Sequence, residues 1–116
     1  MTEKPVWTVD LTEPAEADFA AIIPWTAEQF GSAQAQTYAD TLSAALLALR
    51  DGPDAPGVKR RDEIGAGLCT LHVARGQRRG RHFILFRVRA DEQPPRIEVL
   101  RILHDAMDLA RHVPEG

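Results

Sequence analysis

The chain has 116 residues, of which 44% are hydrophobic and 27% are charged, and its formal net charge is −3. This size and composition predict a single domain spanning residues 1–116 that buries roughly two-thirds of its unfolded surface, and they exclude disordered and fibrous proteins. No apolar run approaches the ~20 residues of a membrane-spanning helix, no signal-like segment begins the chain, and Cys69 is the only cysteine, so we expect a cytoplasmic protein that does not contact a membrane.

The first predicted element is a short strand over residues 6–11, where apolar and polar side chains alternate. Thr12 follows as an N-cap, because its hydroxyl can accept a hydrogen bond from an N–H of the first helical turn. An apolar stripe at helical spacing then continues to Phe30. Pro24 lies inside this stripe, so we expect the helix to kink or break there. Gly31 ends it.

A second helix with one apolar face is predicted next. Gly52 and Pro53 stop it, in the usual order of glycine and then proline. Residues 53–66 are rich in proline, glycine and charge and are predicted to form a loop. The apolar face of the helix consists of Ala35, Tyr38, Leu42, Ala45, Leu46 and Leu49.

Beyond the loop the hydrophobic period changes from helical to two. Residues 68–74, 81–89 and 96–104 are three predicted strands, and their short connections favour antiparallel hairpins. The fold class is therefore α+β, in the order strand, two helices, three strands and a short C-terminal helical tail. The two helices are expected to pack on one face of a mainly antiparallel sheet.

Both faces of the predicted sheet carry large apolar side chains, although two helices can cover only one of them. We therefore expect the other face to expose an apolar patch rimmed by arginine, which usually marks a protein partner. The alternative is that residues 53–66 and the C-terminal tail fold over this face. The residues predicted to bind such a partner are Arg61, Arg75, Phe83, Leu85, Arg87 and Arg89.

Charge is distributed unevenly along the chain. Residues 1–58 carry two basic and nine acidic side chains, whereas residues 59–101 carry eleven basic and five acidic ones. This asymmetry indicates a face with an electrostatic role of its own, and the abundant arginine suits paired contacts to phosphate or carboxylate. The alternative is that acidic helices pack beside basic strands within the molecule. Few aromatic residues interleave with the arginines, which gives little support to base stacking.

Several titratable residues are candidates for chemistry. His104 ends the last predicted strand, where an imidazole can act as a general acid or base, and Glu63 is the carboxylate that we pair with it. The alternative is that His104 only bonds to nearby backbone. His72 and His82 lie within strands and Cys69 in an apolar one, so we expect them to be structural. The histidines show no metal-ligand spacing and no glycine-rich phosphate loop precedes a helix, so we predict neither a metal nor a cofactor.

Four groups of residues, spread over nearly the whole chain, carry a family resemblance. They are Leu11–Ala15 with Asp18, Tyr38 with Leu42 and Leu46, Gly67–Leu68 before Leu71–Val73, and, most specifically, Ile97–His104 with Asp108 and Leu109. Together they resemble the RelE/ParE superfamily of bacterial type II toxins, and the C-terminal group is closer to the ParE-like branch. The resemblance implies a small toxin that a cognate antitoxin wraps and silences in a hetero-oligomeric complex.

The superfamily divides by mechanism. The resemblance to the ParE-like branch implies poisoning of DNA gyrase. The RelE-like alternative is cleavage of mRNA on the ribosome, with Arg81 and Arg101 stabilising the phosphorane charge, His104 protonating the leaving oxygen and Glu63 assisting. A third alternative is an interaction module without toxicity.

Overall fold

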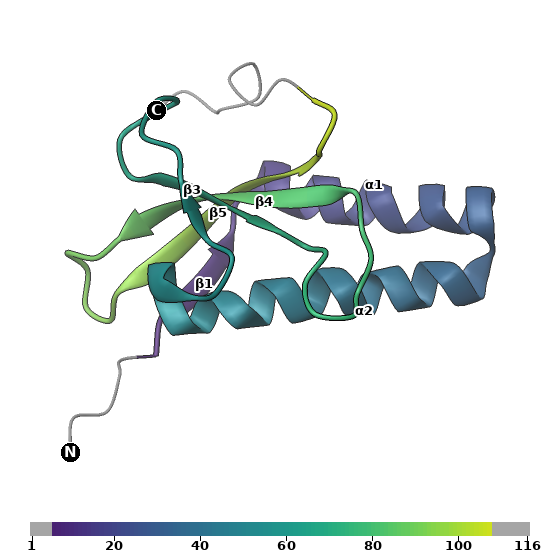
Figure 1. Ribbon diagram of the computed structural model, residues 1–116, viewed down its shortest axis with the longest axis horizontal. Helices are drawn as coiled ribbons and strands as arrows, with labels where there is room; N and C mark the ends of the chain where they lie inside the picture. The colour runs from purple at the N-terminus through teal and green to yellow at the C-terminus, as the bar shows by residue number, and fades with distance from the viewer. Residues whose placement is uncertain (1–5, 108–116) are drawn as a thin grey trace.

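A five-stranded mixed sheet lies against a hairpin of two helices in the computed structural model, which describes residues 6–107 (Figure 1). The elements are β1 (Thr8–Leu11), α1 (Glu13–Phe30), α2 (Ser32–Ala48), the 3₁₀ helix η1 (Leu49–Asp54), β2 (Lys59–Arg60), β3 (Leu68–His72), β4 (His82–Arg89) and β5 (Arg96–His104). The strand order is β1-β5-β4-β3-β2, with β1 parallel to β5 and the other neighbours antiparallel. The predicted α+β class is confirmed, whereas the predicted helical tail, from residue 108 onward, lies outside the described residues.

The start of α1 is the one that the sequence predicts. The Thr12 hydroxyl accepts the Ala15 N–H at 3.3 Å and donates to the Leu100 carbonyl at 3.0 Å, so it caps the helix and ties it to β5. Pro24 lies inside α1 without breaking it. Proline has no backbone N–H, so the Ala20 carbonyl receives no helical hydrogen bond from position 24. Ala20 is exposed, and water can donate to this carbonyl instead.

The path from α2 back to the sheet passes close to Trp7. Helix α2 ends at Ala48, earlier than Gly52, and continues as η1. Gly52 has φ 82°, and a Cβ added to it would stand 2.3 Å from the indole nitrogen of Trp7. The backbone N–H of Trp7 donates to the Arg50 carbonyl at 2.9 Å. This contact holds the end of η1 against the segment that enters β1.

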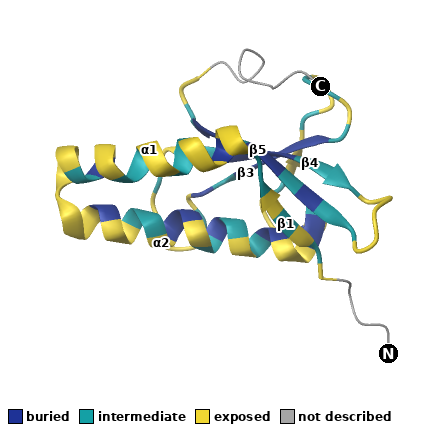
Figure 2. Cartoon of the chain, turned by 180° about the vertical axis from the view of Figure 1, so that it is seen from behind, coloured by how far each residue is buried: buried dark blue, intermediate teal, exposed yellow. Residues whose placement is uncertain are grey.

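The main core fills the space between the helices and the sheet, and fully or partly buried positions alternate with exposed ones along both helices (Figure 2). Cys69 lies in this core, as predicted, and burial raises the pKa of its thiol. The buried members of the core are Ala15, Leu42, Ala45, Leu49, Cys69, Leu71, Val73, Ile84, Phe86, Ile97, Val99 and Ile102.

The sheet face away from the helices is not the open apolar patch that the sequence predicts. Leu85 is 0% exposed there, and Leu68 and Leu103 are buried beside it. Ile64, from the segment between β2 and β3, packs against this second cluster together with Phe83. The loop therefore folds over this face, which was the alternative considered, because apolar side chains on both faces favour removal from water.

The predicted loop also contains a strand. Residues Lys59 and Arg60 form β2, which pairs with β3 opposite Thr70 and Cys69. A two-residue edge strand has no hydrophobic period, so the sequence pattern could not indicate it. Strand β5, in contrast, has the bounds that the alternating pattern predicts.

Candidate functional site

Three histidines, a tyrosine and an aspartate meet where β3 ends, β4 begins and β5 ends. We call Tyr38, His72, His82, His104 and Asp105 the histidine cluster. The antiparallel register places His82 opposite His104, and it places His72 one strand further, opposite Phe83. Tyr38 reaches the cluster from α2, and Asp105 directly follows β5.

Tyr38 and His82 form the inner part of the cluster. The Tyr38 oxygen accepts the Arg81 N–H at 3.1 Å and lies 2.6 Å from Nδ1 of His82. The hydroxyl proton therefore points to His82 Nδ1, and the imidazole proton of His82 is on Nε2. Burial raises the pKa of Tyr38, while burial and then the neighbouring His104 lower the pKa of His82. Both groups are accordingly neutral at pH 7.

His72 and Asp105 form the outer part. The Ala74 N–H donates to His72 Nδ1 at 3.0 Å, so the Nε2–H of His72 donates to Asp105 Oδ2 at 3.1 Å. The guanidinium of Arg81 donates to the other carboxylate oxygen at 3.3 Å. These two bonds hold the pKa of Asp105 below its usual value, and the bond from His72 has the larger effect.

His104 connects the two parts. Its ring meets that of His82 edge to face, with centroids 5.4 Å apart, and its Nδ1 lies 3.7 Å from an Asp105 oxygen. The Ala106 N–H donates to the same Nδ1 at 3.1 Å, which places the proton of neutral His104 on Nε2. Among the hydrogen bonds of residues 6–107, neither the Nε2–H of His82 nor that of His104 has a partner. Two imidazole donors thus remain available to a ligand.

Both imidazoles line a groove of about 630 Å³, which lies between the helical hairpin and the loop of residues 73–81; we call it the aromatic groove. Its aromatic end is formed by Trp25 and Phe30, which are 54% and 66% exposed and meet edge to face with centroids 6.2 Å apart. The remaining described lining residues are Thr26, Gln34, Thr37, Tyr38, Thr41, Gln77, Arg78, Arg79, Gly80, Arg81, His82 and His104.

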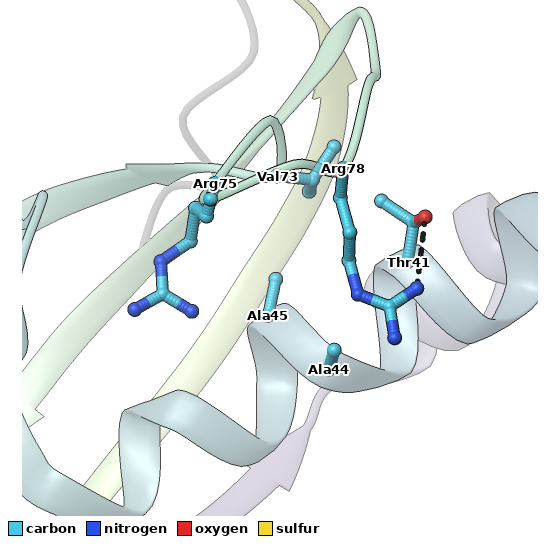
Figure 3. A pocket seen from close by; sticks show the side chains of 7 residues that line it. Thr41, Ala44, Ala45, Val73, Arg75 and Arg78 are labelled. Carbon is cyan, nitrogen blue, oxygen red and sulfur yellow. Dashed lines mark hydrogen bonds between the residues drawn. The ribbon is translucent and has the colours of Figure 1, made fainter.

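A smaller pocket of about 270 Å³ adjoins the aromatic groove and shares Thr41 and Arg78 with it. Figure 3 shows Arg75 and Arg78 reaching from the loop toward α2, where they face Ala44 and Ala45. A guanidinium nitrogen of Arg78 donates to the Thr41 hydroxyl at 3.4 Å. The Arg78 side chain therefore adds a contact between the basic loop and α2 to the one that the Arg81 N–H makes with Tyr38.

Comparison with known proteins decides the family. The family model described as the ParE toxin of the type II toxin–antitoxin system parDE matches residues 9–109. The chain belongs to the ParE toxin family. The solved chromosomal ParDE toxin–antitoxin system from P. aeruginosa has a similar fold, with a TM-score of 0.68 and 20% identity over 85% of this chain and 96% of that chain. A search of curated proteins gives no match. The predicted resemblance is confirmed.

Within this ParE-family fold, only two of the four predicted catalytic residues come together. Arg81 and His104 both contact Asp105. Glu63 lies between β2 and β3, at the opposite end of β3 from His72, and its carboxylate is 3.8 Å from Arg61. It is therefore remote from the imidazole that it was expected to complement.

Arg101, the fourth predicted catalytic residue, is held by α1. Its guanidinium donates to both carboxylate oxygens of Asp18, at 2.7 and 2.9 Å, and the Ile102 N–H donates to the same carboxylate at 2.9 Å. The bonds to Asp18 raise the pKa of Arg101. Its charge is neutralised inside the molecule, which is the alternative that the sequence left open for part of the basic stretch.

The residues predicted to bind a partner do not share one surface. Arg75 lies on the helix side, at the smaller pocket, whereas Phe83 and Leu85 belong to the cluster on the other sheet face. Leu85 is fully buried, and Arg89 donates to Glu98 at 3.2 Å. Arg61 donates to Thr70, and Arg87 is half-buried. A partner-binding role for these six residues stays a prediction.

Within residues 6–107, no group of three or more histidine, cysteine, aspartate or glutamate residues is placed to hold a metal ion. Neither α1 nor α2 is both long and apolar enough to cross a bilayer.

Several residues of the site carry little or no functional signal in the sequence. In the sequence, Tyr38 is one position of the apolar stripe of the second helix. Trp25 and Phe30 are far in sequence from the arginines with which they line the aromatic groove. Asp105 offered a weak signal, because it directly follows His104 at a strand end, where functional groups often lie.

Proposed function

We propose that this chain poisons DNA gyrase and that a cognate antitoxin neutralises it by direct binding in the cytoplasm. Membership in the ParE family, established over residues 9–109, assigns the role of toxin in a type II toxin–antitoxin system. The same match is the observation that supports the proposal, because the ParE-like resemblance implies gyrase as the target.

The geometry of the predicted ribonuclease residues favours gyrase over mRNA. A phosphodiester-cleaving site needs its cations and its proton donors within reach of one phosphate. Arg101 is already bound by Asp18, and Glu63 lies at the far end of β3. The set that was expected to act together is dispersed.

Pulse labelling after induction of the chain alone tests the target. We expect DNA synthesis to fail first while protein synthesis initially continues, and we expect the purified chain to accumulate cleaved plasmid with purified gyrase. Coexpression of the antitoxin should restore growth. If neither DNA nor protein synthesis changes, the chain is a non-toxic interaction module and the proposal is wrong.

The second candidate, cleavage of mRNA, is favoured by one observation: His82 and His104 stand side by side with Tyr38. An immediate fall in protein synthesis on induction would support it. In that case His104→Ala should abolish toxicity while the circular dichroism spectrum and antitoxin binding are retained. Under the gyrase proposal, His104→Ala has no reason to prevent cleavage by gyrase, and toxicity should persist.

For antitoxin binding, Arg87 is the predicted contact whose guanidinium is partly exposed and, among residues 6–107, makes no side-chain hydrogen bond or ion pair, in contrast to Arg61, Arg75 and Arg89. We expect Arg87→Glu to weaken the complex measured by calorimetry, because the reversed charge repels an acidic segment. Lys59→Glu, an equal change of charge on the edge strand β2, is the control. Equal affinities for the two variants would place the antitoxin on another surface.

A further inference from the structure

The aromatic groove has the electrostatic character of an anion-binding site. Of the described residues that line it, three are arginines and two are histidines, and none is acidic, although the chain as a whole is acidic. Asp105, which contacts the lining residues Arg81 and His104, offsets part of the charge of Arg81. Arg78 and Arg79 are exposed, so their charges are available to a ligand. Burial also keeps His82 neutral, so it serves as an N–H donor and not as a counter-charge.

The cations extend over two adjoining pockets. Arg75 and Arg78 line the smaller pocket, and Arg78, Arg79 and Arg81 line the aromatic groove together with His82 and His104. Guanidinium groups spread over two adjoining pockets match the repeating charge of a linear polyanion better than they match a single small anion.

The helical side of the aromatic groove indicates which polyanion it fits, an acidic peptide or a nucleic acid. Trp25 and Phe30 present exposed rings at one end, and α2 contributes the polar side chains of Gln34, Thr37 and Thr41. An acidic amphipathic peptide buries an apolar face rich in aliphatic side chains, whereas the described lining of the groove contains aromatic and polar side chains and no aliphatic one. Flat bases stack on aromatic rings, and their edges pair with amides and hydroxyls, which both donate and accept.

We propose that the aromatic groove binds single-stranded nucleic acid, with bases stacked on Trp25 and Phe30 and phosphates along Arg78 and Arg79. The free Nε2–H groups of His82 and His104 donate to the phosphate at the inner end. This binding is independent of gyrase poisoning and requires no cleavage of the bound strand. The tertiary structure supplies the aromatic residues that the basic stretch lacks in the sequence.

The test is a fluorescence anisotropy titration of the purified chain against fluorescein-labelled oligouridylate and oligothymidylate, each about eight nucleotides long, which is within the site size of single-strand binders. Because RNA and DNA share the phosphate and base chemistry that the groove recognises, the two probes show which of the two nucleic acids binds more tightly. Salt is raised from about 50 mM to about 200 mM, because the slope of log affinity against log salt counts phosphate contacts.

Three variants define the site. The double variant Arg78→Gln/Arg79→Gln should bind about tenfold more weakly, because it loses two phosphate contacts. The slope of log affinity against log salt should become less steep by about 1.4, since each contact contributes ~0.7. Trp25→Leu should also bind about tenfold more weakly but keep the wild-type slope, because stacking releases no counterions. Lys59→Gln/Arg60→Gln, on the edge strand β2, makes the same change of net charge and should keep the wild-type slope.

The proposal is overturned if neither strand binds at protein concentrations up to about 100 μM, the weak limit of non-specific binding. It is also overturned if the two double variants lose affinity equally, since net charge alone would then explain binding. Binding of a labelled peptide of alternating glutamate and leucine, without binding of either oligonucleotide, would assign the groove to a protein segment. Circular dichroism checks the fold of each variant, and Phe30→Leu is the second stacking variant.

Discussion

Arg101 shows how a single residue can be basic in sequence and yet unavailable to a ligand. Its partner Asp18 lies 83 positions earlier, in α1, and accepts three hydrogen bonds from Arg101 and the Ile102 N–H. Both side chains are largely shielded from water, and the carboxylate ties the first turns of α1 to β5. The pair therefore serves the fold, and the arginines of the aromatic groove are the ones that face solvent.

We predict that Asp18→Asn lowers the free energy of unfolding by about 2 kcal/mol, because it weakens charge-assisted hydrogen bonds in a partly buried setting. Urea denaturation measures the change. Glu63→Gln is the matched control: Glu63 is 63% exposed and 3.8 Å from Arg61, so the loss should stay within ~0.5 kcal/mol. In an Arg101→Met background, the effect of Asp18→Asn should shrink if the pair is the cause.

His82 makes stability depend on pH. Its pKa in the folded protein is below the ordinary 6.5, so the unfolded chain binds a proton at a higher pH than the folded chain does. Stability is therefore expected to fall as the pH drops below 6.5 and to level off below the folded-state pKa. The lowered pKa of Asp105 affects a different pH range, because the protein loses the stability that the Asp105 carboxylate contributes only when the pH falls below 3.8.

We expect the wild type to lose stability between about pH 7.5 and about pH 5.5, and His82→Gln to lose less over the same interval, although the variant is less stable throughout without the bond to Tyr38. Urea denaturation at both pH values measures the difference. Lys59→Gln, which removes an exposed charge, should keep the wild-type dependence. If His82→Gln also keeps it, another group titrates in this range.

At the scale of elements, two glycines occupy similar backbone conformations with different surroundings. Gly31, between α1 and α2, has φ 94° and ψ 163°, and Gly52, in η1, has φ 82° and ψ −165°. Only glycine adopts this region readily. A Cβ at Gly31 would meet nothing within 4 Å, whereas one at Gly52 would stand 2.3 Å from the Trp7 indole.

We predict that Gly31→Ala costs about 1–2 kcal/mol of unfolding free energy through backbone strain alone, and that Gly52→Ala costs about 3 kcal/mol or more because the Trp7 ring must also move. Thermal and urea unfolding of the two variants measure the difference. The fluorescence of Trp7 should change in Gly52→Ala and stay as in the wild type in Gly31→Ala. Equal costs would mean that η1 can shift away from Trp7 freely.

For the whole molecule, the sheet is covered on both faces. The helices cover one face, and the segment that carries Ile64 covers the other, over Leu68, Leu85 and Leu103. The remaining exposed apolar surface includes Trp25 and Phe30, which lie in the last two turns of α1. Helix α1 ends at the tip of the helical hairpin (Figure 1). The exposed apolar surface available to a partner is therefore at the aromatic groove beside the helical hairpin and not on the second sheet face.

We predict that Leu85→Ala lowers the free energy of unfolding by about 3 kcal/mol, as expected for a cavity in a packed core. Leu47→Ala, at a residue that is 61% exposed on α2, should change it by less than ~0.5 kcal/mol. Urea denaturation of the two variants measures both changes. A small effect of Leu85→Ala would mean that the second face is open, as the sequence alone suggested.

The sequence by itself determined the two long helices and the four longer strands in their order, but not β2 or η1. It also determined the cap at Thr12, the bounds of β5 and the ParE family. These depend on local patterns: a hydroxyl before an apolar stripe, and alternation over nine residues. Hydrophobic periodicity also identified most of the core, because it marks the side of each element that leaves water.

Only the tertiary structure decided which distant residues meet. The register of β4 on β5 places His82 against His104, the crossing of α1 over β5 joins Asp18 to Arg101, and the hairpin brings Trp25 to the arginines of the β3–β4 loop. Register and crossing result from the simultaneous packing of all elements, and no local pattern encodes them. The candidate site and the covered second face therefore followed from the fold.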